Sequence, residues 1–216
     1  MLNEKLRERL RKISVASISD ALERIGYSNY MVFDIKPIIP GTKIVGPAVT
    51  IKDVPTSKHE VPLLALKALD MAERGDVIVR VVEKTDARNI ALWGGLMTLA
   101  SKVKGLEGAV LDGGTRDVRE IRDYGFPVFA RSIIPCTSVG KTRVEAINVP
   151  VVCGGVLVRP GDIIVGDDDG VVSIPKEVVK EVVEEAERIE ETERKEAEEI
   201  RKGVSLYEIV RRTLRI

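Results

Sequence analysis

Apolar positions along the chain change between a helical and a strand-like spacing. Leucines and Met71 recur every three or four positions over 58–74, which predicts an amphipathic helix, and the run 77–82 after Gly75-Asp76 predicts a strand. The same order follows twice more, with helices over 94–104 and 115–124 and strands over 109–111 and 127–130. This alternation predicts parallel strands joined by crossover helices, and therefore an α/β fold.

Shorter segments flank this alternating region. A helix is predicted over 2–12, and Ser17 to Asp20 offer capping side chains for a second helix that ends at Gly26. The segments 30–53 and 131–175 are rich in short strands and turns. We therefore expect one α/β domain over 1–175 and a helical extension over 176–216.

The C-terminal extension is predicted to be a long, highly charged helix over 176–202, which Gly203 ends. Its apolar residues form only a narrow stripe, so most of the helix should lie on a surface or pack on a neighbouring subunit.

Charge and composition exclude several classes of protein. The chain has 34 basic and 34 acidic residues among 216, so no bulk positive field favours nucleic acid. No apolar run is long enough to cross a membrane and the first residues are charged, so a cytoplasmic protein is expected. Cys136 and Cys153 are expected to be buried, reduced thiols. The absence of glutamine is typical of heat-adapted proteins.

The segment 110–117 carries the most informative chemistry. It predicts a strand, a Gly113-Gly114 turn, and a helix capped by Thr115, with Arg116 in the first turn to meet a carboxylate. Asp117 and Glu120 would share one helix face, where two carboxylates suit Mg²⁺ or Mn²⁺. An ordinary ion-paired surface helix is about equally consistent with these residues alone.

A second glycine pair, Gly94-Gly95, follows Trp93 and opens the preceding predicted helix. Free amides at that helix start could bind the other end of the same small acid. A glycine pair before a helix is more often only a turn, so this signal is weak alone.

Together, the two segments resemble a known family. Gly95, twenty intervening residues, and Arg116-Asp117-Val118-Arg119-Glu120 match the Gly, spacer, Arg-Asp-x-x-Glu/Asp signature of hydroxymethyloxoglutarate/carboxymethyloxaloacetate (HMG/CHA) aldolases and RraA-like proteins. Members have also been labelled demethylmenaquinone methyltransferases. Further segments resemble the family's landmarks: Ser19 to Leu22, Gly46 to Thr50, Gly75 to Val77 and Gly166 to Val171.

The resemblance implies a three-layer α/β sandwich similar to the swivelling phosphohistidine β/β/α domain, assembled as a homotrimer or a dimer of trimers. It also implies a divalent-metal-dependent lyase that cleaves 4-hydroxy-2-oxo acids, or decarboxylates oxaloacetate, through a pyruvate enolate. Asp117 would bind Mg²⁺ or Mn²⁺ directly and Glu120 through water, while Arg116 would grip the substrate's carbonyl or carboxylate. The substrate would also contact backbone amides of Gly94, Gly95, Leu96 and Met97.

Two departures from the family pattern bear on the reaction. Many relatives carry Asp or Glu at the position of Gly95, so aldolase activity depends on whether the glycine is tolerated. The aldolases also use a glutamate from a neighbouring subunit; Glu190, Glu191 and Glu193 are candidates here, and Glu193 is the possible inter-subunit carboxylate. The alternative function is an RraA-like regulator that binds a ribonuclease or another protein without catalysis.

Overall fold

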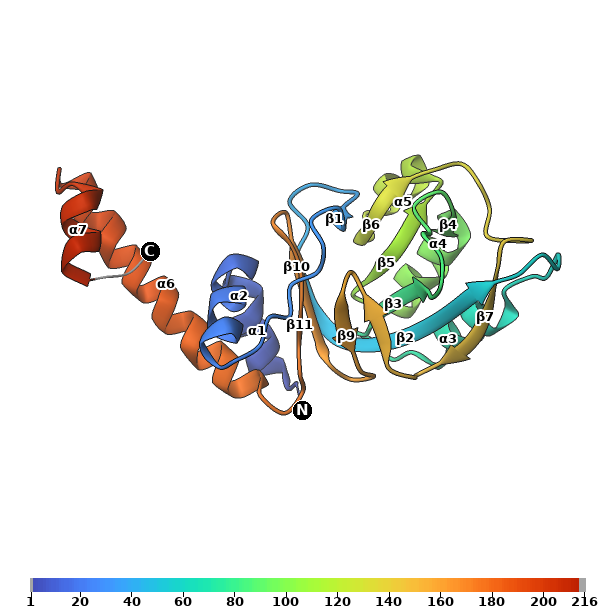
Figure 1. Ribbon diagram of the computed structural model, residues 1–216, viewed down its shortest axis with the longest axis horizontal. Helices are drawn as coiled ribbons and strands as arrows, with labels where there is room; N and C mark the ends of the chain where they lie inside the picture. The colour runs from blue at the N-terminus through green and yellow to red at the C-terminus, as the bar shows by residue number, and fades with distance from the viewer. Residues whose placement is uncertain (1, 214–216) are drawn as a thin grey trace.

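The computed structural model describes residues 2–213 and is built on a mixed sheet whose strands follow the order β1-β6-β5-β3-β2-β10-β11 (Figure 1). β4 is added beside β5, β7 is added beside β2, and β8 and β9 form a separate hairpin. The strands are β1 (Lys36–Pro37), β2 (Ile44–Pro55), β3 (Val77–Val82), β4 (Ala91–Trp93), β5 (Gly108–Thr115), β6 (Val128–Ile133), β7 (Thr142–Ile147), β8 (Val151–Cys153), β9 (Val156–Val158), β10 (Ile163–Asp167) and β11 (Gly170–Ile174).

The middle of the sheet is parallel, as the alternation predicts. β2 pairs with β3, β3 with β5, and β5 with β6, each in parallel. The crossover helices are α3 (Leu63–Met71), α4 (Gly95–Lys104) and α5 (Val118–Tyr124). They cover one face of the sheet, where Ile78, Leu111 and Phe126 belong to one buried cluster. The strand ends that precede α4 and α5 therefore lie at one edge of the fold.

The opposite face is covered by β structure. Phe129 and Val79 pack there against Cys153 and Val156 of the β8–β9 hairpin, and β10 and β11 extend the sheet as an antiparallel pair. The predicted α/β class is confirmed, whereas the likeness to the phosphohistidine domain stays a prediction.

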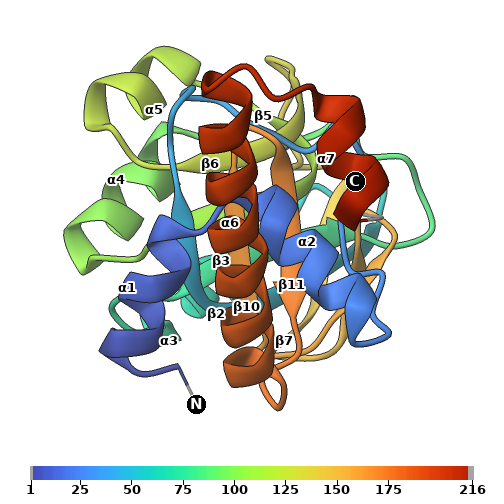
Figure 2. The same ribbon diagram turned by 90° about the vertical axis from the view of Figure 1, so that its left-hand side faces the viewer.

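A third buried cluster lies between β10–β11 and three helices, α1 (Glu4–Lys12), α2 (Val15–Arg24) and α6 (Val179–Arg201). Figure 2 shows α6 running between α1 and α2. The apolar stripe of α6 is buried in this core and packs on its own chain. Two ion pairs reinforce the contact: Arg9 lies 2.6 Å from Glu187, and Arg24 lies 2.7 Å from Glu185.

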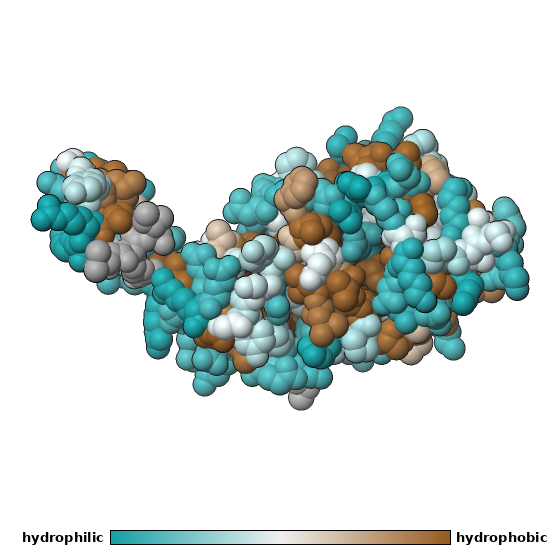
Figure 3. Space-filling model, in the orientation of Figure 1, coloured by the Kyte–Doolittle hydropathy of each residue, from teal (hydrophilic) through white to brown (hydrophobic). Residues whose placement is uncertain are grey.

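The end of α6 and the short helix α7 (Leu206–Thr213) project from the body as an arm (Figure 1). Leu206 and Tyr207 are exposed on α7, and Figure 3 shows apolar surface on the arm beside hydrophilic residues. Packing of this arm on a neighbouring subunit stays a prediction, and so does the division of the chain at residue 175.

Several local expectations are changed by the structure. Ser14, rather than a residue of 17–20, caps α2, because its hydroxyl accepts the amide of Ser17. Cys153 is buried as predicted, and burial raises the pKa of its thiol well above the usual value, but Cys136 is only half-buried. Within residues 2–213, no helix combines the length and the apolar character that crossing a membrane requires.

Candidate active site

The end of β5 differs from the prediction. The strand does not stop at Leu111 but continues through Thr115, and α5 begins only at Val118. The two glycines bring other segments close instead of making a turn: a Cβ at Gly113 would lie 2.7 Å from Leu92 Cδ1, and one at Gly114 would lie 2.6 Å from Ile134 Cγ2. β4 fills this space by pairing with the end of β5.

The turn after β5 is formed by Arg116 and Asp117. Thr115 is buried with its hydroxyl 3.4 Å from the carbonyl of Trp93, so it does not cap α5, and Arg116 precedes the helix instead of lying in its first turn. Asp117 is the N-cap residue, with a left-handed backbone at φ 56° and ψ 42°. Such a backbone costs a residue other than glycine about 1 kcal/mol, and strain of this kind is concentrated at functional sites.

This backbone lets the Asp117 side chain reach α4 instead of the end of its own helix. Its Oδ2 accepts the amide of Gly95 at 3.0 Å and lies 3.6 Å from Nε of Arg116. The amide of Gly95, predicted to be free for substrate, is therefore already occupied.

The start of α4 supplies the remaining amides. Gly94 is the extended N-cap residue, and the first helical hydrogen bond runs from Thr98 N to Gly94 O at 3.0 Å. The amides of Leu96 and Met97 lie within the first turn, where the helix itself offers no acceptor. Trp93 fixes this start, because its indole N–H donates to the Thr98 hydroxyl at 2.9 Å.

Both glycines at this helix start face a carboxylate. A Cβ at Gly94 would lie 2.6 Å from Asp117 Oδ2, and a Cβ at Gly95 would lie 1.6 Å from Glu120 Oε2. The Glu120 carboxylate thus fills the volume that a side chain at Gly95 would take. This contact gives a physical reason for a glycine where many relatives are expected to carry an acid.

The start of α4 and the segment after β5 line one cavity of about 450 Å³. The cavity wall contains Gly94, Gly95, Leu96, Met97, Arg116, Asp117 and Glu120, together with Arg80, Trp93 and residues of the 61–66 and 137–139 segments. The side chains of Arg116 and Asp117 are 43% and 40% exposed, so a small solute can reach them. Every residue of the predicted site except Glu193 is brought together here.

Glu193 lies elsewhere in its own chain. It lines a separate pocket on α6 with Ser14, Glu187 and Glu190. Its approach to the cavity of a neighbouring subunit stays a prediction.

The carboxylates of the cavity fit a loosely held divalent cation. Among residues 2–213 there is no cluster of three His, Cys, Asp or Glu side chains able to enclose a metal. Mg²⁺ does not need such a cage, because it retains several waters and is commonly bound by one or two carboxylates and the substrate. Asp117 and Glu120, at the start of one helix and beside two glycines, match that requirement.

Comparison with known proteins settles the family. Residues 15–173 match the RraA-like family, described as Aldolase/RraA. The chain belongs to the RraA-like family. A protein of Halalkalibacterium halodurans provisionally named 4-hydroxy-4-methyl-2-oxoglutarate aldolase is 40% identical over 178 residues, 82% of this chain and 80% of that protein. An uncharacterised protein of Methanocaldococcus jannaschii is 42% identical over 82% of each chain.

Solved structures agree with this assignment. RraAS2 of Streptomyces coelicolor, described as an unusual member of the RNase ES inhibitor RraA family, superposes with a TM-score of 0.81 at 30% identity, covering 91% of this chain and 97% of that one. An uncharacterised Pseudomonas syringae pv. tomato protein gives a TM-score of 0.85 at 29% identity, covering 96% and 97%. The likeness to the Pseudomonas syringae structure, at 96% of this chain, extends beyond the segment 15–173 that matches the family.

Arg80, in the wall of the cavity of this RraA-like protein, belongs to a buried ion pair that the sequence analysis missed. Arg80 of β3 and Asp53 of β2 are 1% and 0% exposed, and Arg80 Nε lies 2.8 Å from Asp53 Oδ2. Nη1 of Arg80 donates to the carbonyl of Leu92 at 2.5 Å. The sequence does carry a signal for this pair: Arg80 is the charged residue within the apolar run 77–82. All six positions of that strand are buried, and a buried charge needs a partner.

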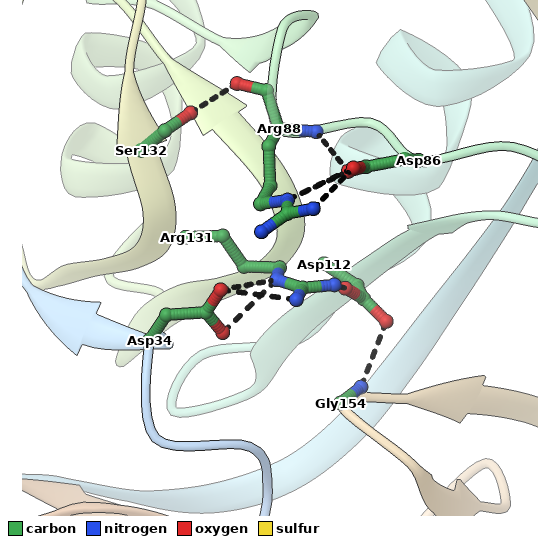
Figure 4. Close-up of polar contacts among 7 residues, drawn as sticks. All are labelled: Asp34, Asp86, Arg88, Asp112, Arg131, Ser132 and Gly154. Carbon is green, nitrogen blue, oxygen red and sulfur yellow. Dashed lines mark hydrogen bonds and ion pairs between the residues drawn. The ribbon is translucent and has the colours of Figure 1, made fainter.

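A second polar network lies on the opposite face of β5 (Figure 4). Arg131 of β6 bridges Asp34 and Asp112, with 3.0 Å contacts to both carboxylates, and Asp112 accepts the amide of Gly154 at 2.8 Å. Nearby, hydrogen bonds from Arg88 lower the pKa of Asp86 to about 2. The Arg131 network ties the last part of β5 to the β8–β9 hairpin and so fixes the strand that carries Arg116 and Asp117.

Proposed function

We propose that this RraA-like protein is a divalent-metal-dependent lyase that cleaves 4-hydroxy-2-oxo acids and releases pyruvate. The observation that supports it is the meeting of Arg116, Asp117, Glu120 and the start of α4 around one cavity. The names of the aldolase relatives are consistent with this proposal.

The chain's own groups suit the charge that forms in such a reaction. Breaking a carbon–carbon bond beside a 2-oxo acid leaves an enolate, so the site must stabilise negative charge on the 2-oxo oxygen. Arg116 lines the cavity, and its guanidinium would stabilise this charge. The amides of Leu96 and Met97, at the positive end of the α4 dipole, would hold the carboxylate of the substrate.

Asp117 and Glu120 are the groups that would hold Mg²⁺ or Mn²⁺, Asp117 directly and Glu120 through water. When bound, the cation would supply Lewis-acid polarisation of the 2-oxo group. Gly95 N and Arg116 fix the orientation of the Asp117 carboxylate before any cation arrives. Such preorganisation reduces the reorganisation that binding requires.

Oxaloacetate decarboxylation is proposed as a second reaction of the same site. Loss of CO₂ from this acid leaves the same pyruvate enolate, so it needs the same groups around the 2-oxo oxygen.

The assembly is proposed to be a homotrimer or a dimer of trimers in which a C-terminal glutamate, Glu193 among the candidates, reaches a neighbouring cavity. The projecting arm, with Leu206 and Tyr207 exposed, gives this proposal a physical basis. Light scattering tests this assembly. Removal of residues 203–216 should lower the number of subunits in each particle, and a monomeric full-length chain would contradict the proposal.

Pyruvate release tests the reaction. Wild type should release pyruvate from 4-hydroxy-4-methyl-2-oxoglutarate and from oxaloacetate only with Mg²⁺ or Mn²⁺. In Asp117→Asn the value of kcat/KM should fall by at least about 100-fold, as expected when a site's main charged group is removed. Asp123→Asn is the matched control, since Asp123 lies on the same helix with its side chain 67% exposed. Equal, metal-insensitive rates in all three proteins would refute the proposal.

The alternative is a regulator that contacts a ribonuclease or another protein. It is suggested by the RNase ES inhibitor family to which the Streptomyces relative belongs. A regulator of this kind would keep its effect in Asp117→Asn, whereas the lyase would not keep its turnover.

A further inference from the structure

One part of the cavity wall is apolar and has no role in the proposed reaction. Val61 and Pro62 lead into α3, Leu66 lies on that helix, and Val139 lies between β6 and β7. All four side chains line the cavity, and we call them the apolar wall. Val61 is 64% and Leu66 is 40% exposed, so the apolar wall borders both the cavity and the solvent.

The two segments of the apolar wall are fixed to each other and to the start of α4. The amide of Thr56 donates to the carbonyl of Lys141 at 2.9 Å, where the end of β2 pairs with the start of β7. A bridge between Thr137 and Ala91 ties the second segment to β4, which leads into α4. A ligand whose carboxylate is held at the start of α4 therefore has the apolar wall as part of the same cavity.

The basic side chains of the cavity are already engaged. Arg80 is 1% exposed and pairs with Asp53, and Nε of Arg116 lies 3.6 Å from the Asp117 carboxylate. Among residues 2–213, the cavity lining contains no other basic side chain. A second carboxylate of the ligand against the apolar wall would lose hydration without gaining a cationic partner. An alkyl group at the same place would remove its own apolar surface and that of the wall from water, which is favourable.

We infer that the apolar wall is a specificity subsite that binds an aliphatic group attached to C4 of a 4-hydroxy-2-oxo acid. The inference rests on the proposed function and adds the class of substrate, namely acids with a single carboxylate and an alkyl tail. An acid with a distal carboxylate, such as 4-hydroxy-4-methyl-2-oxoglutarate, is then cleaved less efficiently than an acid with an alkyl tail.

The products of such a substrate follow from the bond that breaks. The C4 hydroxyl loses its proton, the bond between C3 and C4 breaks, and the C4 oxygen becomes the carbonyl of an aliphatic aldehyde. The electron pair of the broken bond goes to the enolate, which takes up a proton at C3 to give pyruvate. The reaction needs no oxidant or reductant.

Binding of 2-oxo acids that lack a 4-hydroxyl group tests the subsite without turnover. 2-Oxopentanoate and 2-oxoglutarate have the same carbon chain and differ only at C5, which is a methyl group in the first and a carboxylate in the second. In isothermal titration calorimetry, with Mg²⁺ and again in EDTA, wild type should bind 2-oxopentanoate at least about tenfold more tightly. From pyruvate through 2-oxobutanoate to 2-oxopentanoate, each added carbon should tighten binding about fourfold, which corresponds to about 0.8 kcal/mol for a buried methylene.

Leu66→Arg tests the location of the subsite. A guanidinium at this exposed position of α3 would supply the partner that a distal carboxylate lacks, so 2-oxoglutarate should then bind more tightly than 2-oxopentanoate. Met71→Arg is the matched control, since Met71 lies on the same helix, is 53% exposed and does not line the cavity. This control should keep the wild-type order, and the wild-type series still provides a test if Leu66→Arg fails to fold.

Equal or tighter binding of 2-oxoglutarate by wild type, affinities that do not rise along the alkyl series, or binding of none of these acids would overturn the inference. A wild-type order that survives in Leu66→Arg, or a reversal in both variants, would overturn it too. The proposed reaction fails separately. A wild type that shows the alkyl preference but releases no pyruvate with Mg²⁺ keeps the subsite and loses the lyase, and one that releases pyruvate without the preference keeps the lyase and loses the subsite.

Discussion

Gly95→Ala is the substitution for which the structure makes the sharpest prediction. The new Cβ would lie 1.6 Å from Glu120 Oε2 and 2.6 Å from its Cδ. The carboxylate must retreat by about 1.8 Å to reach ordinary van der Waals contact. Glu120 is exposed and can move at little cost, so the expected damage is to the position of one carboxylate and not to the fold.

Gly95→Ala should stabilise the fold and weaken metal binding. Gly95 does not have a positive φ, so alanine fits its backbone and should raise the free energy of unfolding by up to about 1 kcal/mol. Metal affinity should fall about tenfold to a hundredfold, the usual result of losing a group that acts on a metal through water. The rate should fall with it, because a displacement of about 1 Å in a site can cost about a hundredfold.

A double-mutant cycle with Glu120→Gln isolates the cause. Mn²⁺ affinity is measured by electron paramagnetic resonance and stability by urea unfolding. If displacement of Glu120 is the whole effect, Gly95→Ala should cause no further loss of affinity in the Glu120→Gln background. Undiminished Mn²⁺ affinity in Gly95→Ala, or additive losses in the double variant, would refute this reasoning.

Two further predictions concern the scaffold. Arg131→Met should lower the free energy of unfolding by about 3 kcal/mol, since it leaves two largely buried carboxylates without their partner. The control is Arg119→Met, at a side chain that is 94% exposed, which should change the free energy of unfolding by no more than about 0.5 kcal/mol in the same urea titration. Equal losses in the two variants would contradict the role of the network. Hydrogen bonds from Arg9 lower the pKa of Glu187, so this pair stabilises the fold above the carboxylate's ordinary pKa and the contribution is lost as pH falls through the lowered one. The urea midpoint of Glu187→Gln should therefore lie below that of wild type at pH 7 and converge with it in acid, and a gap that widens in acid would reverse the assigned sign.

Periodicity and family resemblance were sufficient for the central features of the fold. The alternation of helices and strands predicted the parallel strands β3, β5 and β6, because parallel neighbours need a crossover connection, which is usually a helix. The family resemblance carried by Gly95 and Arg116-Asp117 implied that both segments contact one substrate, and both line the cavity.

Features that depend on tertiary contacts were not accessible. Gly113 and Gly114 were interpreted as a turn, although they are strand residues that accommodate Leu92 and Ile134. The Asp53–Arg80 pair joins residues 27 positions apart, and their approach depends on the register of β2 against β3. The stripe of α6 could equally have faced a neighbour, and only the position of α1 and α2 decides that it is buried within the chain.

A crystal structure with Mn²⁺ and pyruvate tests the central claim most directly. The anomalous difference peak of Mn²⁺ should lie beside the Asp117 carboxylate, with Glu120 near it through water, Arg116 at the 2-oxo oxygen of pyruvate and its carboxylate at the amides of Leu96 and Met97. A peak away from this cavity, or pyruvate bound elsewhere, would contradict the assignment.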